Sequence, residues 1–400
     1  MYSDIKVKKK LKALIKDLHH KNIEQSDIMI SGIETNSKNV SNGDLFIAIN
    51  GNAQDGHVYI SDAIKNGASA VISNEKIIND FDKPVINIEN TRKAASIISS
   101  RFHDNPSNDL TIIGITGTNG KTTTAYLIKE CLDYAGFKTA QIGTTGVIAE
   151  GYKQEKTLTT PDALTIQKLL KNLVNDGFSH VVMEVSSHAL HQLRVHNVHF
   201  DVAIFTNLTP EHLDYHKTME NYFKVKSTLF NLLNEKNGKA VINYDDDYGK
   251  KLASRLNCDV ALFSKTNLTK SFFSQINDYK NKIDGIIKSN SGSYTIESNL
   301  IGSYNLENIL AAVTTLDLLK ISENAIIQGI KTCKNVPGRL ESFFVKTGAK
   351  VIIDYAHTPD AYDKILSTLK SVLTEKSNLY LVFGAGGDRD SEKRPKMAAI

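Results

Sequence analysis

Short apolar runs alternate with amphipathic stretches along most of the chain, a pattern typical of α/β proteins. Apolar runs predict buried strands at Leu110–Ile115, Val181–Val185, Val202–Phe205 and Ala240–Ile242. Apolar positions at helical spacing predict helices at Thr122–Ala135, Ala163–Val174, Asn221–Leu233 and Tyr304–Leu319. Because strands that alternate with helices form parallel sheets covered on both faces, we expect a mostly parallel sheet.

The first hundred residues predict a separate, small α/β domain. A lysine-rich helical pattern precedes short strand-like runs at Asp44–Ile49 and Ala70–Ile72. The polar stretch His103–Asp109 combines a proline with turn-forming residues and comes directly before the next apolar run. We therefore expect a first domain over residues 1–108.

A third α/β unit is expected after residue 335. The segment Asn267–Tyr294 alternates polar and apolar residues, which predicts antiparallel strands at the edge of the second domain. Further strands are predicted at Val351–Asp354 and Leu379–Phe383. The second domain is thus placed at residues 109–335 and the third at residues 336–400. At about 60 residues, where domains commonly have roughly 100–150, the third domain is expected to be partial.

Composition excludes several classes of protein. The net charge of +4 arises from 48 basic and 44 acidic residues dispersed along the chain, so no nucleic-acid partner is expected. No apolar run approaches the roughly 20 residues that a membrane helix needs, and no signal-peptide pattern is present, so no membrane insertion is expected. The cysteines Cys131, Cys258 and Cys333 form no CxxC pair, which fits a reducing cytoplasm.

A glycine-rich turn lies between a predicted strand and a predicted helix, in the segment Gly114–Thr123. Backbone N–H groups of such a turn can surround phosphate oxygens, while Lys121 supplies a positive charge and Thr122 a hydroxyl for magnesium. Five residues rather than the usual four separate Gly114 from Gly120. The alternative is a glycine-rich turn that binds nothing.

Acidic and histidine side chains follow the next two predicted strands. Glu184 ends one of them, where α/β sheets hold their ligands, and its carboxylate could hold magnesium. His212 lies in the His- and Asp-rich stretch Thr206–His216 and could bind a second metal ion. A salt-bridging glutamate and a polar loop before a capped helix are the structural alternatives.

Polar residues later in the chain could face a nucleotide across a domain cleft. Asn305 opens a predicted helix, Arg339 begins the third unit, and Asp354 ends a predicted strand. Arg389 follows the last predicted strand and could pair with a carboxylate through two hydrogen bonds. A helix cap, a surface salt bridge and a solvated loop are the alternatives.

The order of five motifs resembles the Mur ligase family, in particular its MurE type, which adds the third peptide residue. The motifs are Gly-Thr-Asn-Gly-Lys-Thr-Thr, Glu-Val-Ser-Ser-His, Asn-Leu-Thr-Pro-Glu-His-Leu-Asp-Tyr-His, Gly-Arg-Leu-Glu and Asp-Tyr-Ala-His-Thr-Pro-Asp. The resemblance implies a three-domain architecture with a central P-loop ATPase-like parallel sheet and a Rossmann-like C-terminal domain. It also implies an ATP-dependent ligase of peptidoglycan synthesis that uses Mg²⁺.

The resemblance assigns binding residues by motif. Those expected to bind ATP are Gly117, Thr118, Asn119, Gly120, Lys121, Thr122, Thr123, Asn305, Arg339 and Asp354. Those expected to bind the UDP-MurNAc-dipeptide or the amino acid are Ser37, Asn52, Ala53, Gln54, Thr159, Thr160, Ser186, Gln192, Arg194 and Arg389. The family usually has Asp-Ser-Arg where this chain has Asn-Ser-Lys at residues 36–38.

The metal ligands implied are Thr122, Glu184, His212 and Lys226, the last as a carbamylated lysine. A carbamate would turn a repelling ammonium into an anionic oxygen ligand. Lys224 is the competing position, and only the motif register selects Lys226. The catalytic residues implied are Lys121, Lys226 and His212.

The implied reaction proceeds through an acyl phosphate and joins a diamino acid to UDP-MurNAc-L-Ala-D-Glu. The segment Gly386–Asp390 favours meso-diaminopimelate over L-lysine as that diamino acid. We expect a monomer. The alternatives are a folylpolyglutamate synthetase, another Mur ligase, or a nucleotide-binding protein without turnover.

Overall fold

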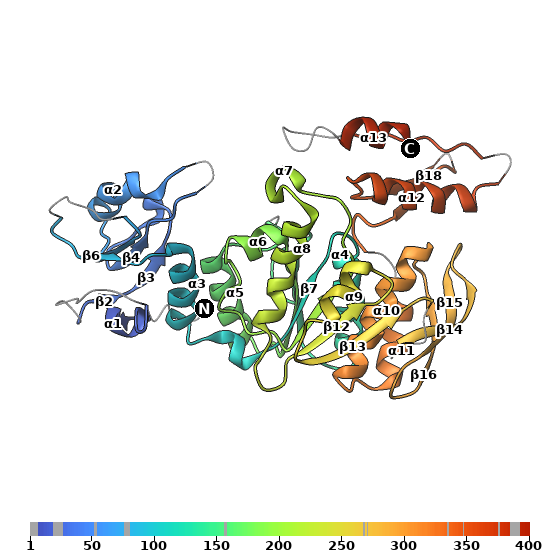
Figure 1. The fold of residues 1–400 in the computed structure, drawn as a ribbon, viewed down its shortest axis with the longest axis horizontal. Helices are drawn as coiled ribbons and strands as arrows, with labels where there is room; N and C mark the ends of the chain where they lie inside the picture. Colours follow the sequence, from blue (N-terminus) through green and yellow to red (C-terminus); the bar gives the residue numbers. More distant parts are fainter. Residues whose placement is uncertain are drawn as a thin grey trace. The chain divides into compact units, whose positions relative to one another are not determined.

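The structure is a computed structural model that describes residues 7–18, 27–51, 54–75, 81–155, 158–266, 269, 271–333, 336–346, 348–374, 377–384 and 393–400 (Figure 1). The chain forms two compact units. The first comprises Met1–Asp109, Pro161–Asp176 and His188–Val198, and the second comprises Leu110–Thr160, Gly177–Ser187 and His199–Ile400. The division into three domains at residues 108 and 335 stays a prediction.

The first unit is built on a four-stranded parallel sheet of order β3-β4-β5-β6. Its strands are β3 (Gly32–Glu34), β4 (Asp44–Ile47), β5 (Ala70–Ser73) and β6 (Val85–Asn87). The two strands predicted in this region are therefore confirmed. A short antiparallel pair, β1 (Lys9–Lys10) with β2 (Met29–Ile30), stands apart from this sheet.

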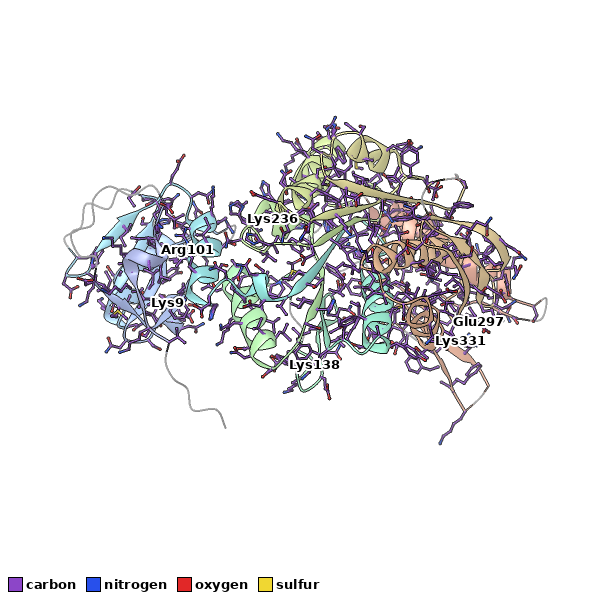
Figure 2. The ribbon with its side chains drawn as sticks, turned by 90° about the horizontal axis from the view of Figure 1, so that it is seen from below. Lys9, Arg101, Lys138, Lys236, Glu297 and Lys331 are labelled. Carbon is purple, nitrogen blue, oxygen red and sulfur yellow. The ribbon has the colours of Figure 1, made fainter. Side chains whose placement is uncertain are left out.

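Helices α1, α2, α3 and α5 each bury apolar side chains in the first unit, which also contains three short 3-10 helices. They are α1 (Leu11–Leu14), η1 (Ser37–Asn39), η2 (Gly56–Tyr59), α2 (Ile60–Lys65), α3 (Thr91–Phe102), η3 (Pro106–Asp109) and α5 (Ala163–Asn175). Leu14, Leu45 and Ile98 are fully buried in one cluster, and burial of such side chains contributes roughly 1.5–3 kcal/mol each. The Lys9 ammonium also donates to the carbonyl of Arg101 at 2.7 Å, tying β1 to α3 (Figure 2).

The second unit contains a ten-stranded sheet of order β16-β15-β14-β13-β12-β11-β7-β10-β8-β9. Its strands are β7 (Thr111–Thr116), β8 (Thr139–Gly143), β9 (Gly146–Ile148), β10 (His180–Glu184), β11 (Val202–Phe205), β12 (Lys239–Asn243), β13 (Asp259–Ser264), β14 (Ser271–Asp278), β15 (Ile283–Lys288) and β16 (Ser293–Ser298). The sheet is parallel from β8 to β14 and antiparallel at both edges. Both the parallel sheet and its antiparallel edge were predicted and are confirmed.

Strand β7 lies between β10 and β11. From β7 the chain continues to β8, on the β10 side of the sheet, and later forms β11 on the opposite side of β7. Parallel sheets bind ligands beside the carboxyl ends of strands at such a reversal of strand order. Gly117 and His212 lie in the segments that follow β7 and β11, and Glu184 is the last residue of β10. The topology therefore gathers the three motif segments at one edge of the sheet.

Helices α4, α9, α10 and α11 contact this sheet, α4 packs against both α10 and α11, and the second unit contains further helices that lie elsewhere in it. The helices are α4 (Lys121–Tyr134), α6 (Ser187–His191), α7 (Leu213–His216), α8 (Met219–Ser227), η4 (Thr228–Leu232), α9 (Asp247–Ala253), α10 (Ser303–Leu318), α11 (Glu323–Thr332), α12 (Pro359–Val372) and α13 (Lys393–Ala399). The helix predicted at Asn221–Leu233 is divided between α8 and η4. No helix in the described part of the chain is long and apolar enough to span a membrane.

The last part of the second unit contains a small antiparallel pair, β17 (Glu341–Phe344) with β18 (Lys350–Ile353). The strand predicted at Leu379–Phe383 is wrong. Residues 377–384 pair with no described strand, and the Val382 side chain is almost completely exposed. An apolar, β-branched run predicts a strand only where a partner completes its hydrogen bonds, and sequence pattern cannot supply that partner.

Candidate active site

The loop between β7 and α4 requires glycine at two positions. Gly117 and Gly120 have φ values of +148° and +87°, which side chains rarely adopt. A Cβ at Gly117 would lie 1.9 Å from Oγ1 of Thr206, and one at Gly120 would lie 2.3 Å from Oδ1 of Asn308. The loop is therefore packed so tightly that only glycine fits, with α4 beginning directly after it at Lys121.

Lys121 folds back over this loop. Its ammonium donates to the carbonyl oxygens of Gly117 and Thr118, each at 2.9 Å. Desolvation lowers the pKa of Lys121, although the carboxylates of Glu184 and Glu211 oppose that shift. The geometry of loop, lysine and helix N-terminus is that of a phosphate cradle.

Glu184, at the end of β10, is fully buried beside this cradle. Its carboxylate accepts hydrogen bonds from the Thr122 hydroxyl at 2.9 Å and from the Thr144 N–H and hydroxyl at 3.0 and 3.1 Å. Magnesium in nucleotide sites takes one or two carboxylates besides phosphate and water oxygens. The paired Thr122 hydroxyl and Glu184 carboxylate are hard oxygen donors that fit such an ion.

Three of the predicted substrate-binding residues gather around Glu184. The Thr160 hydroxyl donates to the Glu184 carbonyl at 2.8 Å and accepts from the Ser186 N–H at 3.0 Å. The Thr159 hydroxyl lies 3.2 Å from that of Thr144. Sequence reasoning missed Thr144, whose link to Glu184 arises from the pairing of β8 with β10.

Lys226 on α8 is buried, whereas Lys224 is exposed. The Lys226 amine lies 2.8 Å from the Gly117 carbonyl and 4.7 Å from the centre of the Tyr222 ring. Burial, followed by the nearby charge of Lys121, holds the pKa of Lys226 well below its usual value. Its nitrogen is therefore in the neutral, nucleophilic form far more readily than that of a surface lysine.

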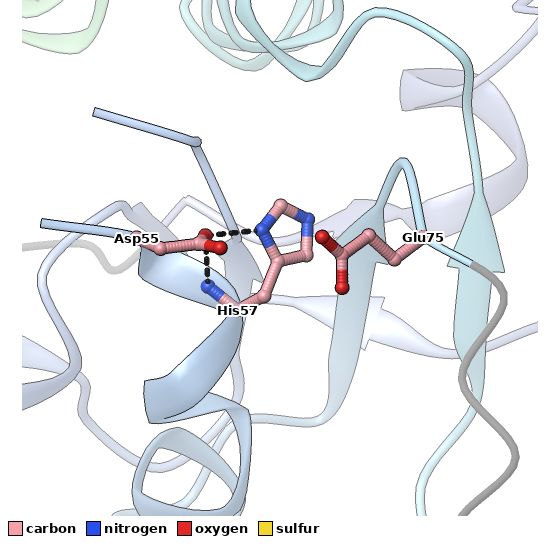
Figure 3. A group of neighbouring side chains, drawn as sticks. All are labelled: Asp55, His57 and Glu75. Atoms are coloured by element: carbon pink, nitrogen blue, oxygen red, sulfur yellow. Dashed lines mark hydrogen bonds and ion pairs between the residues drawn. The ribbon is translucent and has the colours of Figure 1, made fainter. Parts of the chain in front are cut away.

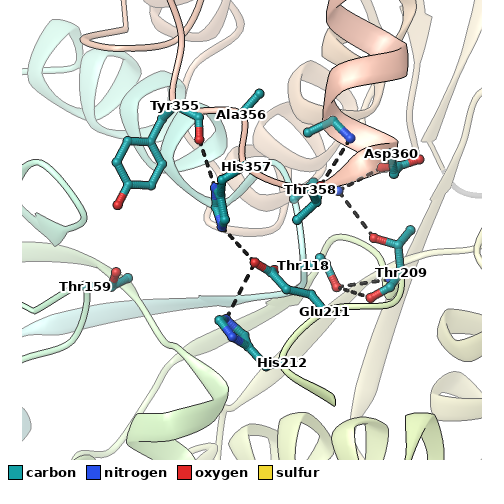
Figure 4. Close-up of polar contacts among 12 residues, drawn as sticks. Thr118, Thr159, Thr209, Glu211, His212, Tyr355, Ala356, His357, Thr358 and Asp360 are labelled. Atoms are coloured by element: carbon teal, nitrogen blue, oxygen red, sulfur yellow. Dashed lines mark hydrogen bonds and ion pairs between the residues drawn. The ribbon is translucent and has the colours of Figure 1, made fainter. Parts of the chain in front are cut away.

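Glu211 is a residue that sequence reasoning did not single out. Its buried carboxylate lies 2.7 Å from Nε2 of His357 and 3.7 Å from Nε2 of His212 (Figure 4). Burial opposes its ionisation, but the hydrogen bond from His357 and the charges around it lower the pKa of Glu211 to about 2. It is thus an anionic centre beside the cradle.

Among the described residues, three or more His, Cys, Asp or Glu side chains close enough to share a metal ion occur only at Asp55, His57 and Glu75. Glu184 and His212 therefore belong to no such group. Of the four predicted metal ligands, a hydrogen bond joins Thr122 to Glu184 directly, and Lys226 contacts the Gly117 carbonyl of the loop before α4. His212 stands beside Glu211, in a left-handed backbone conformation with φ of +55°.

A pocket adjoins the cradle and brings together most of the predicted ATP-binding residues. Its lining includes Asn119, Gly120, Thr122, Thr123, Asn207, Tyr304, Asn305, Asn308, Arg339, Asp354, Lys364 and Ile365. Arg339 donates to the Thr122 hydroxyl at 3.1 Å, and Asn119 donates to the Asp360 carboxylate at 2.9 Å. Burial raises the pKa of Asp354, whose carboxylate accepts the Leu340 and Ala356 N–H groups.

The remaining predicted residues are in the first unit or outside the described part. Ser37 is buried, and its carbonyl accepts from the Asn66 side chain at 2.9 Å. Gln54 is exposed, and its carbonyl closes a turn with the Gly51 N–H. Arg194 donates to the Gln192 side chain through two nitrogens, at 2.7 and 3.2 Å. The predicted residues Asn52, Ala53 and Arg389 lie outside the described residues.

Comparisons with known proteins give the family of this chain. The Mur ligase middle domain matches residues 115–316, the glutamate ligase domain of Mur ligases matches residues 338–400, and the Mur ligase family catalytic domain matches residues 29–103. A Clostridium perfringens protein named UDP-N-acetylmuramoyl-L-alanyl-D-glutamate–2,6-diaminopimelate ligase is 38% identical, with 98% of this chain and 81% of that protein aligned. A protein of the same name from Geobacter sulfurreducens is 39% identical, with 93% and 74% aligned.

Solved structures extend the likeness. A structure of a UDP-N-acetylmuramoyl-L-alanyl-D-glutamate–2,6-diaminopimelate ligase superposes with a TM-score of 0.77 at 29% identity, covering 98% of this chain and 80% of that one. Mycobacterium tuberculosis folylpolyglutamate synthase has a TM-score of 0.58 at 16% identity, covering 70% of each chain, and shares the fold alone. The match of three Mur ligase domains in order, together with relatives 38% identical over nearly the whole chain, shows that the chain belongs to the Mur ligase family.

Proposed function

We propose that the chain joins meso-diaminopimelate to UDP-MurNAc-L-Ala-D-Glu at the expense of ATP, during peptidoglycan synthesis. The observation that carries this proposal is the agreement of relatives that bear the diaminopimelate ligase name over nearly the whole chain. The same relatives favour it over a folylpolyglutamate synthetase, for which only the fold is similar.

ATP is proposed to bind with its phosphates on the Gly117–Gly120 loop and its base in the adjoining pocket. Asn305 is buried in that pocket and is held by its own hydrogen bond to the Ile301 carbonyl at 2.7 Å. Lys121, now directed at loop carbonyls, would turn to the terminal phosphates. Its charge would stabilise the negative charge that spreads over the transferred phosphoryl group.

The first step transfers this phosphoryl group. An oxygen of the dipeptide's glutamyl side-chain carboxylate attacks the γ-phosphorus, the bond to the β,γ-bridging oxygen breaks, and ADP leaves with that electron pair. The product is an acyl phosphate. Thr159, Thr160 and Ser186 are proposed to hold the dipeptide because their hydroxyl groups gather at the end of β10. The Thr160 hydroxyl contacts the Glu184 carbonyl oxygen and the Ser186 hydroxyl, and the Thr159 hydroxyl contacts that of Thr144.

The second step forms the amide. The neutral amine of diaminopimelate attacks the acyl carbon, the carbon–oxygen bond to phosphate breaks, and the amine nitrogen loses a proton. Both steps require that water is excluded from the site. The segment that contains Arg339 and Asp360 would therefore have to close over the cradle before each turnover. The contacts of Arg339 with Thr122 and of Asp360 with Asn119 support that role.

Thr122, Glu184, His212 and a carbamylated Lys226 are proposed to hold the magnesium ions. When bound, magnesium would neutralise charge on the phosphate oxygens. The carbamate forms when the neutral Lys226 nitrogen adds to the carbon of CO₂ and loses a proton. The depressed pKa of Lys226 supports this reaction because an ammonium has no lone pair to donate.

A phosphate-release assay tests the proposed function. With ATP, Mg²⁺ and UDP-MurNAc-L-Ala-D-Glu, we expect phosphate release with meso-diaminopimelate and little with L-lysine. Phosphate release with L-lysine but not with meso-diaminopimelate would mean that L-lysine is the amino-acid substrate, and the proposed type of reaction would still hold. A folded chain that binds Mg-ATP but releases no phosphate with either amino acid would contradict the reaction and favour a nucleotide-binding protein without turnover. We propose that the reaction takes place in the cytoplasm, in line with three cysteines that form no CxxC pair, whereas the monomeric state stays a prediction.

A further inference from the structure

Three side chains of the first unit converge at a place that the proposed reaction does not use. Asp55, His57 and Glu75 each present a ligand atom, and these atoms lie within 4.8 Å of one another (Figure 3). Asp55 and His57 follow β4, whereas Glu75 follows β5. The group therefore lies at the carboxyl edge of a parallel sheet, where α/β sheets hold ligands.

Asp55 fixes the orientation of the His57 ring. Its carboxylate lies 2.6 Å from Nδ1 of His57 and accepts the backbone N–H of the same residue at 3.0 Å. The same carboxylate oxygen accepts the backbone N–H and lies at hydrogen-bond distance from Nδ1, where it is placed to accept again. Nδ1 must therefore carry the proton.

The other ring nitrogen faces Glu75. The His57 side chain is only 5% exposed, and its Nε2 has no hydrogen-bond partner in the described part of the chain. In the tautomer with its proton on Nδ1, the ring presents a lone pair at Nε2. A buried lone pair directed at a carboxylate is unfavourable unless a positive charge lies between them.

Glu75 can supply the second ligand. Its backbone is fixed by the N–H hydrogen bond to the Ser73 hydroxyl at 3.0 Å. The side chain is exposed and enters no ion pair among the described residues, so its carboxylate can move the short distance that metal–ligand bonds of about 2.0–2.2 Å require.

We infer that Asp55, His57 and Glu75 form a binding site for a divalent transition-metal ion of the zinc, cobalt or nickel class. Nε2 of His57 and the Glu75 carboxylate bind the ion directly, and water completes its coordination. Asp55 contacts Nδ1, the ring nitrogen that does not bind the ion, and so orients the metal-binding histidine. An imidazole nitrogen among the ligands favours these ions over magnesium or calcium. The inference does not depend on the proposed ligase reaction.

Metal titration of the full chain tests this site. Bound metal ions are removed from the chain with a chelator. The chain is then titrated with Co²⁺ as the only transition metal, in a buffer with excess Mg²⁺ to fill the proposed ATP site. We expect wild type to bind one Co²⁺ more than His57→Gln and Glu75→Gln, with a visible absorption band that both variants lose. Asp55→Asn should retain the site with affinity lowered about 10–100-fold.

Two controls and one direct probe complete the experiment. His103→Gln and Glu89→Gln remove a histidine and an exposed glutamate of the same unit and should bind Co²⁺ like wild type. Because Glu75 is exposed, its variant should fold normally, which circular dichroism checks. Zn²⁺ should shift the NMR signal of Nε2 of His57. Equal stoichiometry and equal spectra in wild type, His57→Gln and Glu75→Gln would overturn the site and leave His57 as a proton carrier between two carboxylates.

Discussion

Nε2 of His357 lies 2.7 Å from the carboxylate of Glu211, and this contact joins the segment after β18 to the loop before α7. Glu211 is 5% exposed and His357 is 50% exposed, so one partner is buried and the other is partly screened by solvent. The same carboxylate faces His212, a predicted metal ligand. The pair therefore connects closure of the C-terminal segment with the centre of the proposed reaction.

We predict that Glu211→Gln weakens Mg-ATP binding roughly five-fold, which corresponds to about 1 kcal/mol for a half-exposed ion pair. The expected cause is loss of the charge that attracts His357. Isothermal titration with wild type, Glu211→Gln, His357→Gln and the double variant measures the coupling. Affinity losses that simply add in the double variant would mean that the pair does not couple the two segments.

Glycine substitutions separate backbone strain from the loss of the phosphate cradle. Gly120 and Gly136 have nearly equal φ values of +87° and +88°, but a Cβ would collide with Asn308 only at Gly120. We predict that both Gly→Ala variants lose about 1–2 kcal/mol of unfolding free energy from the left-handed backbone. Only Gly120→Ala should also lose Mg-ATP affinity, by more than ten-fold.

Chemical denaturation and nucleotide titration of the two variants make this comparison. If Gly136→Ala loses ATP affinity to the same extent, the effect comes from general destabilisation. In that event the loop has no special role in binding phosphate.

Lys226→Ala is predicted to lower kcat by roughly 100-fold or more, because it removes a proposed metal ligand. Lys224→Ala removes only a surface charge and should leave kcat within about two-fold of wild type. Lys226 is buried against the cradle and Lys224 is exposed. If the carbamate is the active form, removal of CO₂ and bicarbonate should lower wild-type activity and their return should restore it. Mass spectrometry under native conditions should show an additional mass of about 44 Da, that of one CO₂, in wild type and in Lys224→Ala but not in Lys226→Ala. Full activity in Lys226→Ala would exclude the assignment.

The sequence was sufficient to predict the parallel sheet and the loop at its centre because local patterns determine both. The run before Gly117, the helix after it and the strand that ends at Glu184 are each visible in a few residues. Long-range relationships were less accessible. Glu211 and His357 meet only because the C-terminal segment folds back on the cradle, and nothing near either residue indicates the other. Likewise, Glu75 joins His57 only because β4 and β5 are neighbours in one sheet.

Burial also distinguishes residues that look alike in sequence. Spacing on α8 gave no reason to prefer Lys226 over Lys224, and only the family resemblance selected it. The structure separates them, since Lys226 faces the Gly117 carbonyl and Lys224 faces solvent. The run at Leu379–Phe383 shows the opposite case, in which a clear local pattern fails because no described strand pairs with it.

His103 should make stability depend on pH. Burial, followed by the charges of Lys168, Lys9 and Lys171, lowers the pKa of His103 from 6.5 to about 4. Between these values the unfolded chain binds a proton that the folded chain does not, so stability rises with pH. This contribution is complete above about pH 7, is lost as the pH falls from 6.5 towards 4, and does not change further below that.

Because His103 is only partly buried, we predict a loss of about 1–2 kcal/mol over this range. Denaturant unfolding of wild type and His103→Gln at several pH values measures it, and the variant should show the smaller slope between pH 6.5 and 4. Asp104 opposes the effect by raising the pKa of its neighbour, so Asp104→Asn should steepen the dependence on pH. Equal slopes in wild type and His103→Gln would show that His103 titrates alike in the folded and unfolded chain, and that the lysines around it are screened by solvent.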